Sequence, residues 1–291
     1  MIEGTIIKAL SGFYYVLTEN GTLICRARGK FRKEGMIPLV GDHVLCSVDS
    51  ECYGRVDEIS VRKNSFIRPA VANIDALIFV AAEATPVTEP WLIDRVSVIA
   101  SAANAELILC VNKTDLKDGK LLSETYRKAG FTVISTSAIS GEGVELLRNA
   151  IDGKTCAFTG NSGVGKSSLL NCLCPQFSIE TGEISSHLGR GKHTTRHVEF
   201  FNINSRTIVA DTPGFASFDI EMIEPIQAEK LQFHFRDFSD YLGKCRFNDC
   251  THRKEPGCAV TEAVKKGIIV QSRYQSYCRL YELSASHCSW K

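Results

Sequence analysis

A glycine-rich segment near the middle of this 291-residue chain constrains its fold more than any other feature. The segment consists of Gly160, Asn161, Ser162, Gly163, Val164, Gly165, Lys166 and Ser167. A β-rich run over residues 156–159 precedes it, and a helix-forming run that begins at Ser168 follows it. This is the context of a P-loop, in which glycines let successive backbone N–H groups converge on phosphate at a helix N-terminus. The alternative is a glycine-rich turn that binds no ligand.

The P-loop pattern predicts roles for individual residues. Lys166 would place a positive charge between the β- and γ-phosphates of a nucleotide, and the Ser167 hydroxyl would coordinate Mg²⁺. The backbone of residues 160–168 would hold the phosphates. We therefore predict a nucleotide site with magnesium, in which Lys166 also serves catalysis.

A second polar segment ends the apolar run over residues 107–111 and consists of Asn112, Lys113, Thr114 and Asp115. Ligand sites belong at this edge of a parallel sheet. The Asp115 carboxylate can accept both N–H groups of guanine's Watson–Crick edge, whereas adenine would leave the buried charge unpaired. Asn112 and Lys113 would support the loop and the base face. Taken alone, the segment is equally consistent with a surface turn.

Two further segments fit the same pocket. Ser137 and Ala138 follow another predicted strand and suit a second base-contacting loop. Asp211 and Gly214 follow the run over residues 206–210, where Asp211 would hold Mg²⁺ through water and the Gly214 N–H would sense the γ-phosphate. The segments reinforce one another and predict a GTP and GDP site.

Residues 189–196 are polar and contain two glycines, as a mobile switch would. A threonine of this segment would complete the Mg²⁺ shell, and we favour Thr195, with Thr194 next. The base-reading segments precede the P-loop, whereas in most GTPases they follow it. The sequence therefore predicts a circularly permuted P-loop GTPase, because a site is defined by space and not by chain order.

The rest of the chain predicts a multidomain α/β protein. Residues 1–64 hold short β-rich runs separated by turns, which suits a closed β-barrel of the OB-fold type. In residues 65–220, strands are predicted at 76–82, 107–111, 131–135, 155–158 and 206–210, and helices at 91–103, 121–129, 144–151 and 166–173. Their alternation predicts a mostly parallel sheet covered on both faces. Residues 221–291 are predicted to form a helical domain.

Four residues of that last domain have the spacing of a metal site, Cys-x4-Cys-x-His-x5-Cys, and these are Cys245, Cys250, His252 and Cys258. Three thiolates and one imidazole form the usual closed shell of structural Zn²⁺, with no open position for catalysis. The alternative is reduced cysteines in a loop.

Composition limits the binding partners and the cellular location that we expect. The net charge is +1, so nucleic-acid binding would require local basic patches. No apolar stretch approaches the roughly 20 residues that cross a bilayer, and no signal peptide is evident, so we expect a cytoplasmic protein without membrane association. Most of the twelve cysteines are expected to stay reduced, as small core residues. Nothing suggests more than a monomer.

The permuted motif order, the barrel-like N-terminus and the Cys/His cluster together resemble the RsgA family of small ribosomal subunit biogenesis GTPases over essentially the whole chain. The resemblance implies an OB-fold, a permuted GTPase domain and a zinc-binding helical domain. It also implies a late-acting factor that binds the small ribosomal subunit and its rRNA and is stimulated by it. Two other functions stay open: a nucleotide-gated RNA-binding module with incidental hydrolysis, and a GTPase of large-subunit assembly.

The water-positioning group is not evident from the motifs. Phe215 follows Gly214, where Ras-like switches use a glutamine. His193 could position water as a neutral imidazole, and the resemblance favours it, although it could equally be an exposed loop histidine.

Basic residues in two regions could contact RNA. The first group follows a β-rich run of the barrel, where alternation would put several of its members on one side, and it contains Arg26, Arg28, Lys30, Arg32 and Lys33. The second group flanks the Cys/His cluster and contains Arg253, Lys254, Lys265 and Lys266. The alternative is a solvated polar surface.

Overall fold

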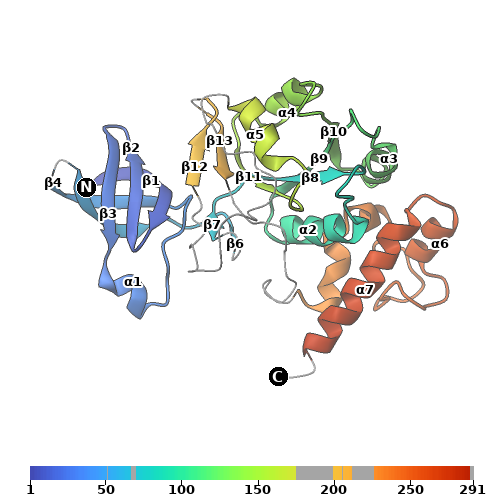
Figure 1. Ribbon diagram of the computed structural model, residues 1–291. Helices are drawn as coiled ribbons and strands as arrows, with labels where there is room; N and C mark the ends of the chain where they lie inside the picture. Colours follow the sequence, from blue (N-terminus) through green and yellow to red (C-terminus); the bar gives the residue numbers. More distant parts are fainter. Residues whose placement is uncertain (51, 67–69, 175–198, 205, 212–225, 289–291) are drawn as a thin grey trace, which may run out of the picture.

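The computed structural model describes residues 1–50, 52–66, 70–174, 199–204, 206–211 and 226–288. These residues form an N-terminal barrel, a central sheet with helices on both faces, and a C-terminal helical region (Figure 1). The barrel and the C-terminal region lie at opposite sides of the central sheet.

Five strands make the barrel, namely β1 (Ile2–Leu10), β2 (Phe13–Thr18), β3 (Gly21–Ala27), β4 (His43–Ser50) and β5 (Tyr53–Ile59). They pair in the order β1-β2-β3-β5-β4, and β4 pairs with β1 to close the barrel. Only β3 and β5 run parallel. This order is that of an OB-fold and confirms the fold predicted for the N-terminal region.

Six strands make the central part of the sheet, namely β8 (Ala76–Ala82), β9 (Glu106–Asn112), β10 (Thr132–Ser135), β11 (Thr155–Thr159), β12 (Glu199–Asn202) and β13 (Ile208–Asp211). Their order is β10-β9-β8-β11-β13-β12, and β12 alone among them runs antiparallel to its neighbour. The mostly parallel sheet is confirmed. The strand β12 was not predicted, because its sequence places two phenylalanines side by side and shows no alternation of apolar and polar residues.

Helices cover both faces of this sheet, namely α2 (Pro90–Ala102), α3 (Lys120–Lys128), α4 (Val144–Ile151) and α5 (Lys166–Leu173). Leu77 and Phe79 of β8 pack toward α2 and α3, whereas Ile78 and Val80 pack toward α4 and α5. Burial of both sets explains why β8 is apolar at every position. Burial also raises the pKa of the Cys110 thiol to about 12, as expected for an inert core cysteine.

The barrel joins the central sheet through an edge strand and a small connecting hairpin. Lys8 of β1 pairs with Glu199 of β12, so the two sheets are continuous. Between barrel and sheet, β6 (Ser65–Phe66) pairs with β7 (Val71–Ala72). Val71 and the barrel residue Ile6 belong to one buried cluster that also reaches β8.

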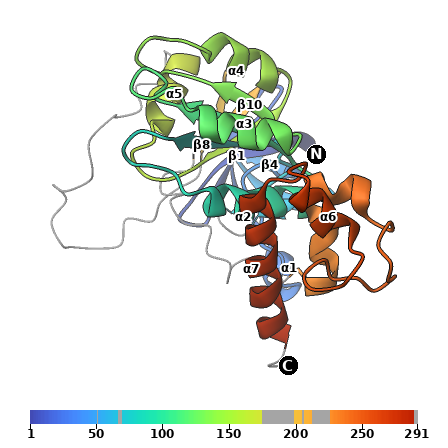
Figure 2. The same ribbon diagram turned by 90° about the vertical axis from the view of Figure 1, so that its right-hand side faces the viewer.

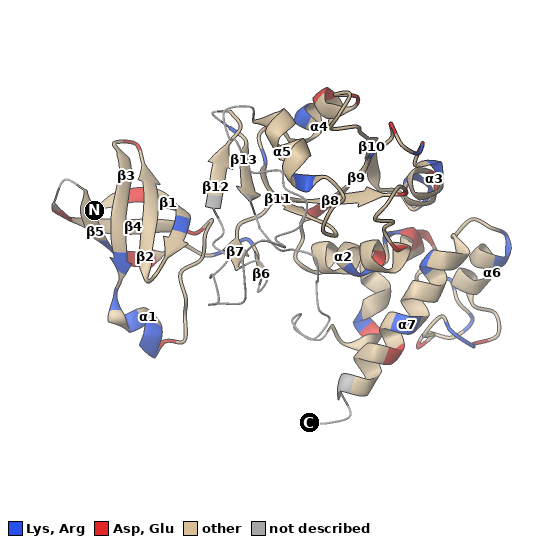
Figure 3. Ribbon diagram, viewed as in Figure 1, with Lys and Arg blue, Asp and Glu red and all other residues tan. Residues whose placement is uncertain are grey.

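The basic segment after β3 differs from the prediction. It forms the short helix α1 (Gly29–Lys33) instead of a continued strand, so strand alternation does not place its side chains. Lys30, Arg32 and Lys33 are exposed on α1 (Figure 3). Arg28 lies just before the helix, and its Nε is 2.5 Å from Asp57 Oδ1 on β5.

The C-terminal region contains two 3₁₀ helices and two α-helices, namely η2 (Ala228–His234), η3 (Arg236–Tyr241), α6 (Ala259–Lys265) and α7 (Gln271–Cys288). In Figures 1 and 2, α7 lies against α2 and crosses it obliquely. Val98 of α2 is buried in the same cluster as Phe235, Phe238 and Tyr277. The C-terminal region therefore packs directly on the helix that follows β8.

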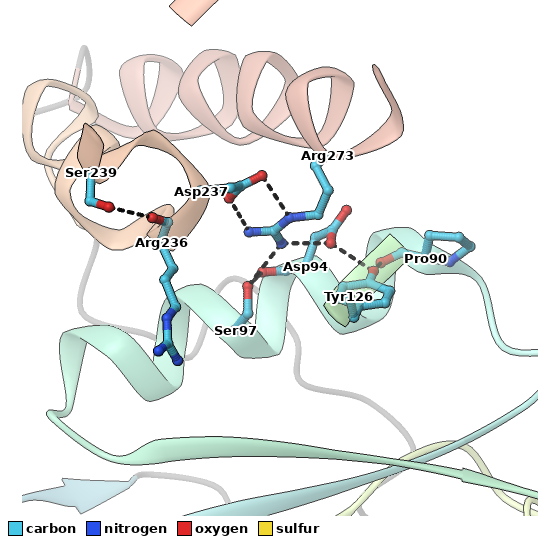
Figure 4. Close-up of polar contacts among 8 residues, drawn as sticks. All are labelled: Pro90, Asp94, Ser97, Tyr126, Arg236, Asp237, Ser239 and Arg273. Atoms are coloured by element: carbon cyan, nitrogen blue, oxygen red, sulfur yellow. Dashed lines mark hydrogen bonds and ion pairs between the residues drawn. The ribbon is translucent and has the colours of Figure 1, made fainter. Parts of the chain in front are cut away.

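A buried ion-pair network fixes this interface (Figure 4). Arg273 of α7 is fully buried and donates to Asp94 Oδ1 on α2 at 2.7 Å. Its other nitrogens donate to both carboxylate oxygens of Asp237 on η3, at 2.8 and 3.3 Å. The Tyr126 hydroxyl of α3 also donates to Asp94 Oδ1, at 2.7 Å. Burial alone would lower the pKa of Arg273, but the two carboxylates raise it above its ordinary value.

Two further expectations can be compared with the described part of the chain. None of its helices is long and apolar enough to cross a membrane. The cysteine side chains that the structure describes are all free thiols. The predicted domain boundaries at residues 64 and 220 stay predictions.

We predict that Arg273→Met lowers the free energy of unfolding by about 3–5 kcal/mol, because Asp94 and Asp237 would be left buried without a counter-charge. Urea denaturation followed by circular dichroism measures this change. Arg206→Met is the control, because it removes an exposed pair with Asp152, and it should cost less than about 1 kcal/mol. Equal effects of the two substitutions would contradict the prediction.

Candidate nucleotide-binding site and metal centre

The carboxyl ends of the parallel strands place the predicted motifs at one edge of the sheet. β9 ends at Asn112, β10 ends at Ser135, β11 ends at Thr159 and β13 ends at Asp211. The strand β8 lies between β9 and β11, so the loop that follows β8 separates the base-reading segment from the P-loop. This edge is where open α/β sheets bind ligands.

The P-loop leaves β11 and enters α5, as the sequence predicts. At Gly160 a Cβ atom would lie 2.1 Å from the carbonyl oxygen of Val80, so only glycine fits there. Lys166 Nζ donates to the carbonyl oxygens of Gly160 and Asn161, at 2.8 and 2.7 Å, which keeps the ammonium group over the loop. Ser167 and Ser168 lie in the first turn of α5.

Asn112 connects the base-reading segment to the P-loop. Its side chain is 2% exposed, and its Nδ2 donates to the carbonyl oxygen of Val164 at 2.8 Å. Its Oδ1 accepts from the Thr136 hydroxyl at 3.1 Å and from the Ala138 N–H at 3.2 Å. One amide thus joins its own segment to the P-loop and to the second base loop. Gly165 makes this approach possible, because a Cβ there would lie 2.2 Å from Asn112 Nδ2.

Asp115 lies next to the second base loop. The Ser137 hydroxyl donates to Asp115 Oδ1 at 2.6 Å and accepts from the Ser140 N–H at 3.1 Å. A hydroxyl that donates to one carboxylate oxygen restricts rotation of the carboxylate. This arrangement suits a carboxylate that accepts two parallel N–H groups from a base.

Lys113 and Thr114 complete the segment. Lys113 has a left-handed backbone, with φ of 65°, and its Nζ donates to the carbonyl oxygen of Thr85 at 2.7 Å. The Thr114 N–H and hydroxyl both donate to the carbonyl oxygen of Thr136, at 3.2 and 3.0 Å. The two base loops are therefore tied by backbone as well as by side chains.

The magnesium-side residues are only partly described. Asp211 is the last residue of β13, which pairs in parallel with β11, so its backbone lies beside the start of the P-loop. His193, Thr194, Thr195, Gly214 and Phe215 lie outside the described residues. Their predicted roles stay predictions.

The structure adds a loop that the motifs did not predict. Residues 83–88 follow β8, and Thr88 closes them through hydrogen bonds with both the N–H and the carbonyl oxygen of Ala82, at 3.0 and 2.8 Å. The carbonyl oxygen of Thr85 in this loop accepts from Lys113. The loop also places Pro86 next to Gly163 of the P-loop, where an added Cβ would lie 3.4 Å from the proline ring. Its position after an apolar strand at the ligand-binding edge was the one available sequence signal.

The four predicted metal ligands meet in the C-terminal region, and their ligand atoms all lie within 4.8 Å of one another. Cys245 Sγ is 3.9 Å from Cys258 Sγ. His252 Nδ1 is 3.4 Å from both of these sulfurs. Zinc–sulfur bonds of about 2.3 Å in a tetrahedron would separate two sulfurs by roughly 3.8 Å. The donor set and its spacing therefore fit Zn²⁺.

The surroundings of this cluster also suit a metal. The second ring nitrogen of His252, Nε2, is 2.7 Å from Gln232 Oε1 and can donate to it, which leaves Nδ1 as the ligand atom. Burial lowers the pKa of His252 and so favours the neutral ring. The N–H of Ala259 donates to Cys245 Sγ at 3.3 Å, which favours a thiolate.

Comparison with known proteins agrees with this architecture. The RsgA GTPase family model matches residues 59–221, and the RsgA N-terminal domain model matches residues 3–56. Proteins named Small ribosomal subunit biogenesis GTPase RsgA are similar to the chain. The one from Caldanaerobacter subterraneus is 45% identical over 96% of this chain and 94% of its own length. The one from Bacillus pumilus is 46% identical over 95% of each chain.

Solved structures show the same arrangement. The crystal structure of YjeQ from Thermotoga maritima matches with a TM-score of 0.81 and 32% identity, over 98% of each chain. The structure of YloQ, described as a circularly permuted GTPase, matches with a TM-score of 0.79 and 36% identity, over 99% of this chain and 96% of that one. The chain therefore belongs to the RsgA GTPase family and is a GTP hydrolase whose motifs stand in circularly permuted order behind an OB-fold barrel.

Proposed function

We propose that this GTPase acts in the cytoplasm as a switch in late maturation of the small ribosomal subunit. The GTPase binds the rRNA of the subunit, and the subunit stimulates its hydrolysis of GTP. The observation that carries the proposal is the hydrogen bond from Asn112 to Val164, because it joins a guanine-type loop and a P-loop into one pocket. The relatives named as small ribosomal subunit biogenesis GTPases supply the biological setting.

In this proposal the pocket reads the nucleotide at both ends. Asp115 accepts the two guanine N–H groups, with Ser137 and Ala138 beside it. The backbone of the P-loop and Lys166 hold the phosphates. Ser167, Thr195 and Asp211 serve Mg²⁺, which would neutralise charge that develops on the phosphates. The Gly214 N–H would sense whether the γ-phosphate is present.

His193 is proposed to position the attacking water. Phe215 cannot do so, because a phenyl ring has neither a donor nor an acceptor. Slow turnover by the isolated protein follows, with contact to the ribosomal particle bringing His193 to the attacking water. Hydrolysis would then mark a step of assembly instead of running continuously.

The Cys245, Cys250, His252 and Cys258 cluster is proposed to hold one structural Zn²⁺. The fit of the donors supports this assignment. The metal would fix the loop of residues 245–258 on the aromatic cluster around Tyr277, whose hydroxyl donates to the Thr251 carbonyl oxygen at 2.8 Å. All four positions of the metal would be filled by the protein, so its role is to stabilise the fold.

Basic side chains of the barrel and the C-terminal region are proposed to contact rRNA phosphates. Lys30, Arg32 and Lys33 on α1 are exposed and available for this role. In the C-terminal group, Arg253 stacks on Tyr281 at 4.0 Å and Lys265 pairs with Glu262 at 2.8 Å. Lys254 and Lys266 of the same group are exposed. The protein is proposed to act as a monomer.

We predict that isolated small ribosomal subunits raise the GTP turnover of this protein by at least about tenfold, and that His193→Ala removes most of that stimulation, because a general base contributes about 10²–10⁴-fold. Phosphate release is measured with and without small or large subunits. Equal nucleotide binding by the variant is the control. Absence of stimulation would favour a nucleotide-gated RNA-binding module, and stimulation by large subunits alone would favour large-subunit assembly.

We predict that the purified protein contains about one equivalent of zinc and that Cys250→Ser removes most of it and lowers the melting temperature, because the tetrahedral shell loses a thiolate. Elemental analysis and a thermal melt measure both effects. Cys278→Ser is the matched control, since Cys278 lies in the same apolar cluster but outside the four ligands. Full zinc content in Cys250→Ser, or loss of zinc in both variants, would contradict the assignment.

A further inference from the structure

We propose that Glu83 is a positioning residue for guanine recognition. From its position directly after β8, it holds the base-reading segment in place. The inference rests on the proposed role of Asp115 in reading guanine. Glu83 belongs to none of the nucleotide-binding motifs. It follows β8 directly, and its side chain is 6% exposed although it is a carboxylate.

The buried carboxylate of Glu83 has two partners, and both belong to the segment that follows Asp115. Its Oε1 accepts the backbone N–H of Leu122 at 2.8 Å. Its Oε2 lies 3.4 Å from Lys117 Nζ. A carboxylate is rarely buried to this extent without such partners, so the two contacts account for its position.

The N-cap residue of helix α3 supplies no side-chain cap. This residue is Gly119, in a left-handed conformation with φ of 65°, and glycine has no side chain to accept a hydrogen bond. The first turn also contains no acidic residue. The first N–H groups of a helix need acceptors, and a negative charge is favourable there. Asp118 Oδ1 accepts the N–H of Lys120 at 3.3 Å, and Glu83, which lies directly after β8, accepts the N–H of Leu122.

The contact with Glu83 fixes the far end of the segment that carries Asp115. The near end is Asn112, which is bonded to the P-loop and to the Ser137–Ala138 loop. The far end is Leu122, which is bonded to Glu83. Asp115 lies between these two anchors. Loss of either anchor would let the carboxylate move relative to the base, and misplacement of about 1 Å is costly in such sites.

The loop that begins at Glu83 contacts the pocket at two more points. The carbonyl oxygen of Thr85 accepts from Lys113 Nζ at 2.7 Å, and Pro86 covers Gly163 of the P-loop. Residues 83–88 therefore lie between the base-reading and phosphate-binding loops. Among their side chains, that of Glu83 is bonded only toward the base-reading side, so its removal should affect the base end of the pocket.

Glu83 could instead stabilise the fold without affecting recognition. The two roles differ in what they change. Loss of a structural role would lower the stability of the protein and weaken the binding of every ligand by a similar factor. Loss of a positioning role would weaken the binding of guanine nucleotides and leave the binding of a ligand without a base unchanged. Inorganic pyrophosphate is such a ligand, since it offers only the contacts of the P-loop.

The experiment measures the binding of GDP, of XDP (the xanthine analogue) and of pyrophosphate by calorimetry, together with melting temperatures. We expect Glu83→Ala to weaken GDP binding about 10- to 50-fold and pyrophosphate binding less than about 2-fold. We expect Glu83→Asp to weaken GDP to a similar extent, because the shorter side chain cannot reach the Leu122 N–H. Glu83→Gln keeps the acceptor oxygen and should stay within about 3-fold of the wild type.

If Glu83→Ala fails to fold, the comparison of Glu83→Asp with Glu83→Gln decides the question. Equal GDP binding by these two variants, or an equal loss of GDP and pyrophosphate binding, would overturn the proposal. Glu124→Ala is the matched control, because Glu124 is an exposed carboxylate of α3, and this variant should bind GDP normally. Asp115→Asn tests the proposed guanine reading separately, since it should exchange a preference for GDP for a preference for XDP. If that exchange occurs and Glu83→Asp binds GDP normally, only the inference about Glu83 fails.

Discussion

The side-chain amide of Asn112 is the contact on which the nucleotide pocket depends. It bonds to the phosphate loop through Val164 and to the second base loop through Ala138, while its own segment carries Asp115. An amide can do this because it offers donors and an acceptor on one rigid group. The hydrogen bonds of Asn112 depend on which residues lie close together and not on their order in the chain. They therefore explain why a permuted sequence forms the same kind of pocket. What matters is that β9, β10 and β11 end at one edge of the sheet.

The order of the strands also explains how the C-terminal region is placed. The helix α2 follows β8, the strand between the two halves of the pocket, and it carries Asp94. Arg273 binds that carboxylate from α7, and Tyr126 binds it from α3, the helix that begins after the base-reading segment. Arg273 also pairs with Asp237 of η3. Separation of α7, α2 and η3 would leave these charges unpaired in the interior, so all three elements must be in place. The Cys/His cluster shares an apolar core with the same helix α7.

Much of the fold and part of the site could be predicted from sequence. The strand at residues 76–82 and the helices at 144–151 and 166–173 have the predicted bounds, because apolar periodicity and glycine punctuation agree there. The metal cluster was predicted from spacing alone, since close ligands in one loop need no knowledge of the tertiary fold. Glu83 and Arg273 were not predicted. Each is a charged residue whose partners lie far away in the chain, so only the folded structure shows that it is buried. The helix α1 was not predicted, because five residues are too few to establish a period.

The most direct test of this account is the binding of two ligands by Asn112→Ala. The substitution removes the bond to the P-loop and the bond to the second base loop at once. We expect GDP binding to fall at least about 100-fold and pyrophosphate binding to fall about 5- to 10-fold, because a buried hydrogen bond contributes about 0.5–1.5 kcal/mol on average and an unpaired group costs about 1–3 kcal/mol. A variant that binds pyrophosphate as the wild type does, while it loses only GDP, would show that the two halves of the pocket do not depend on each other.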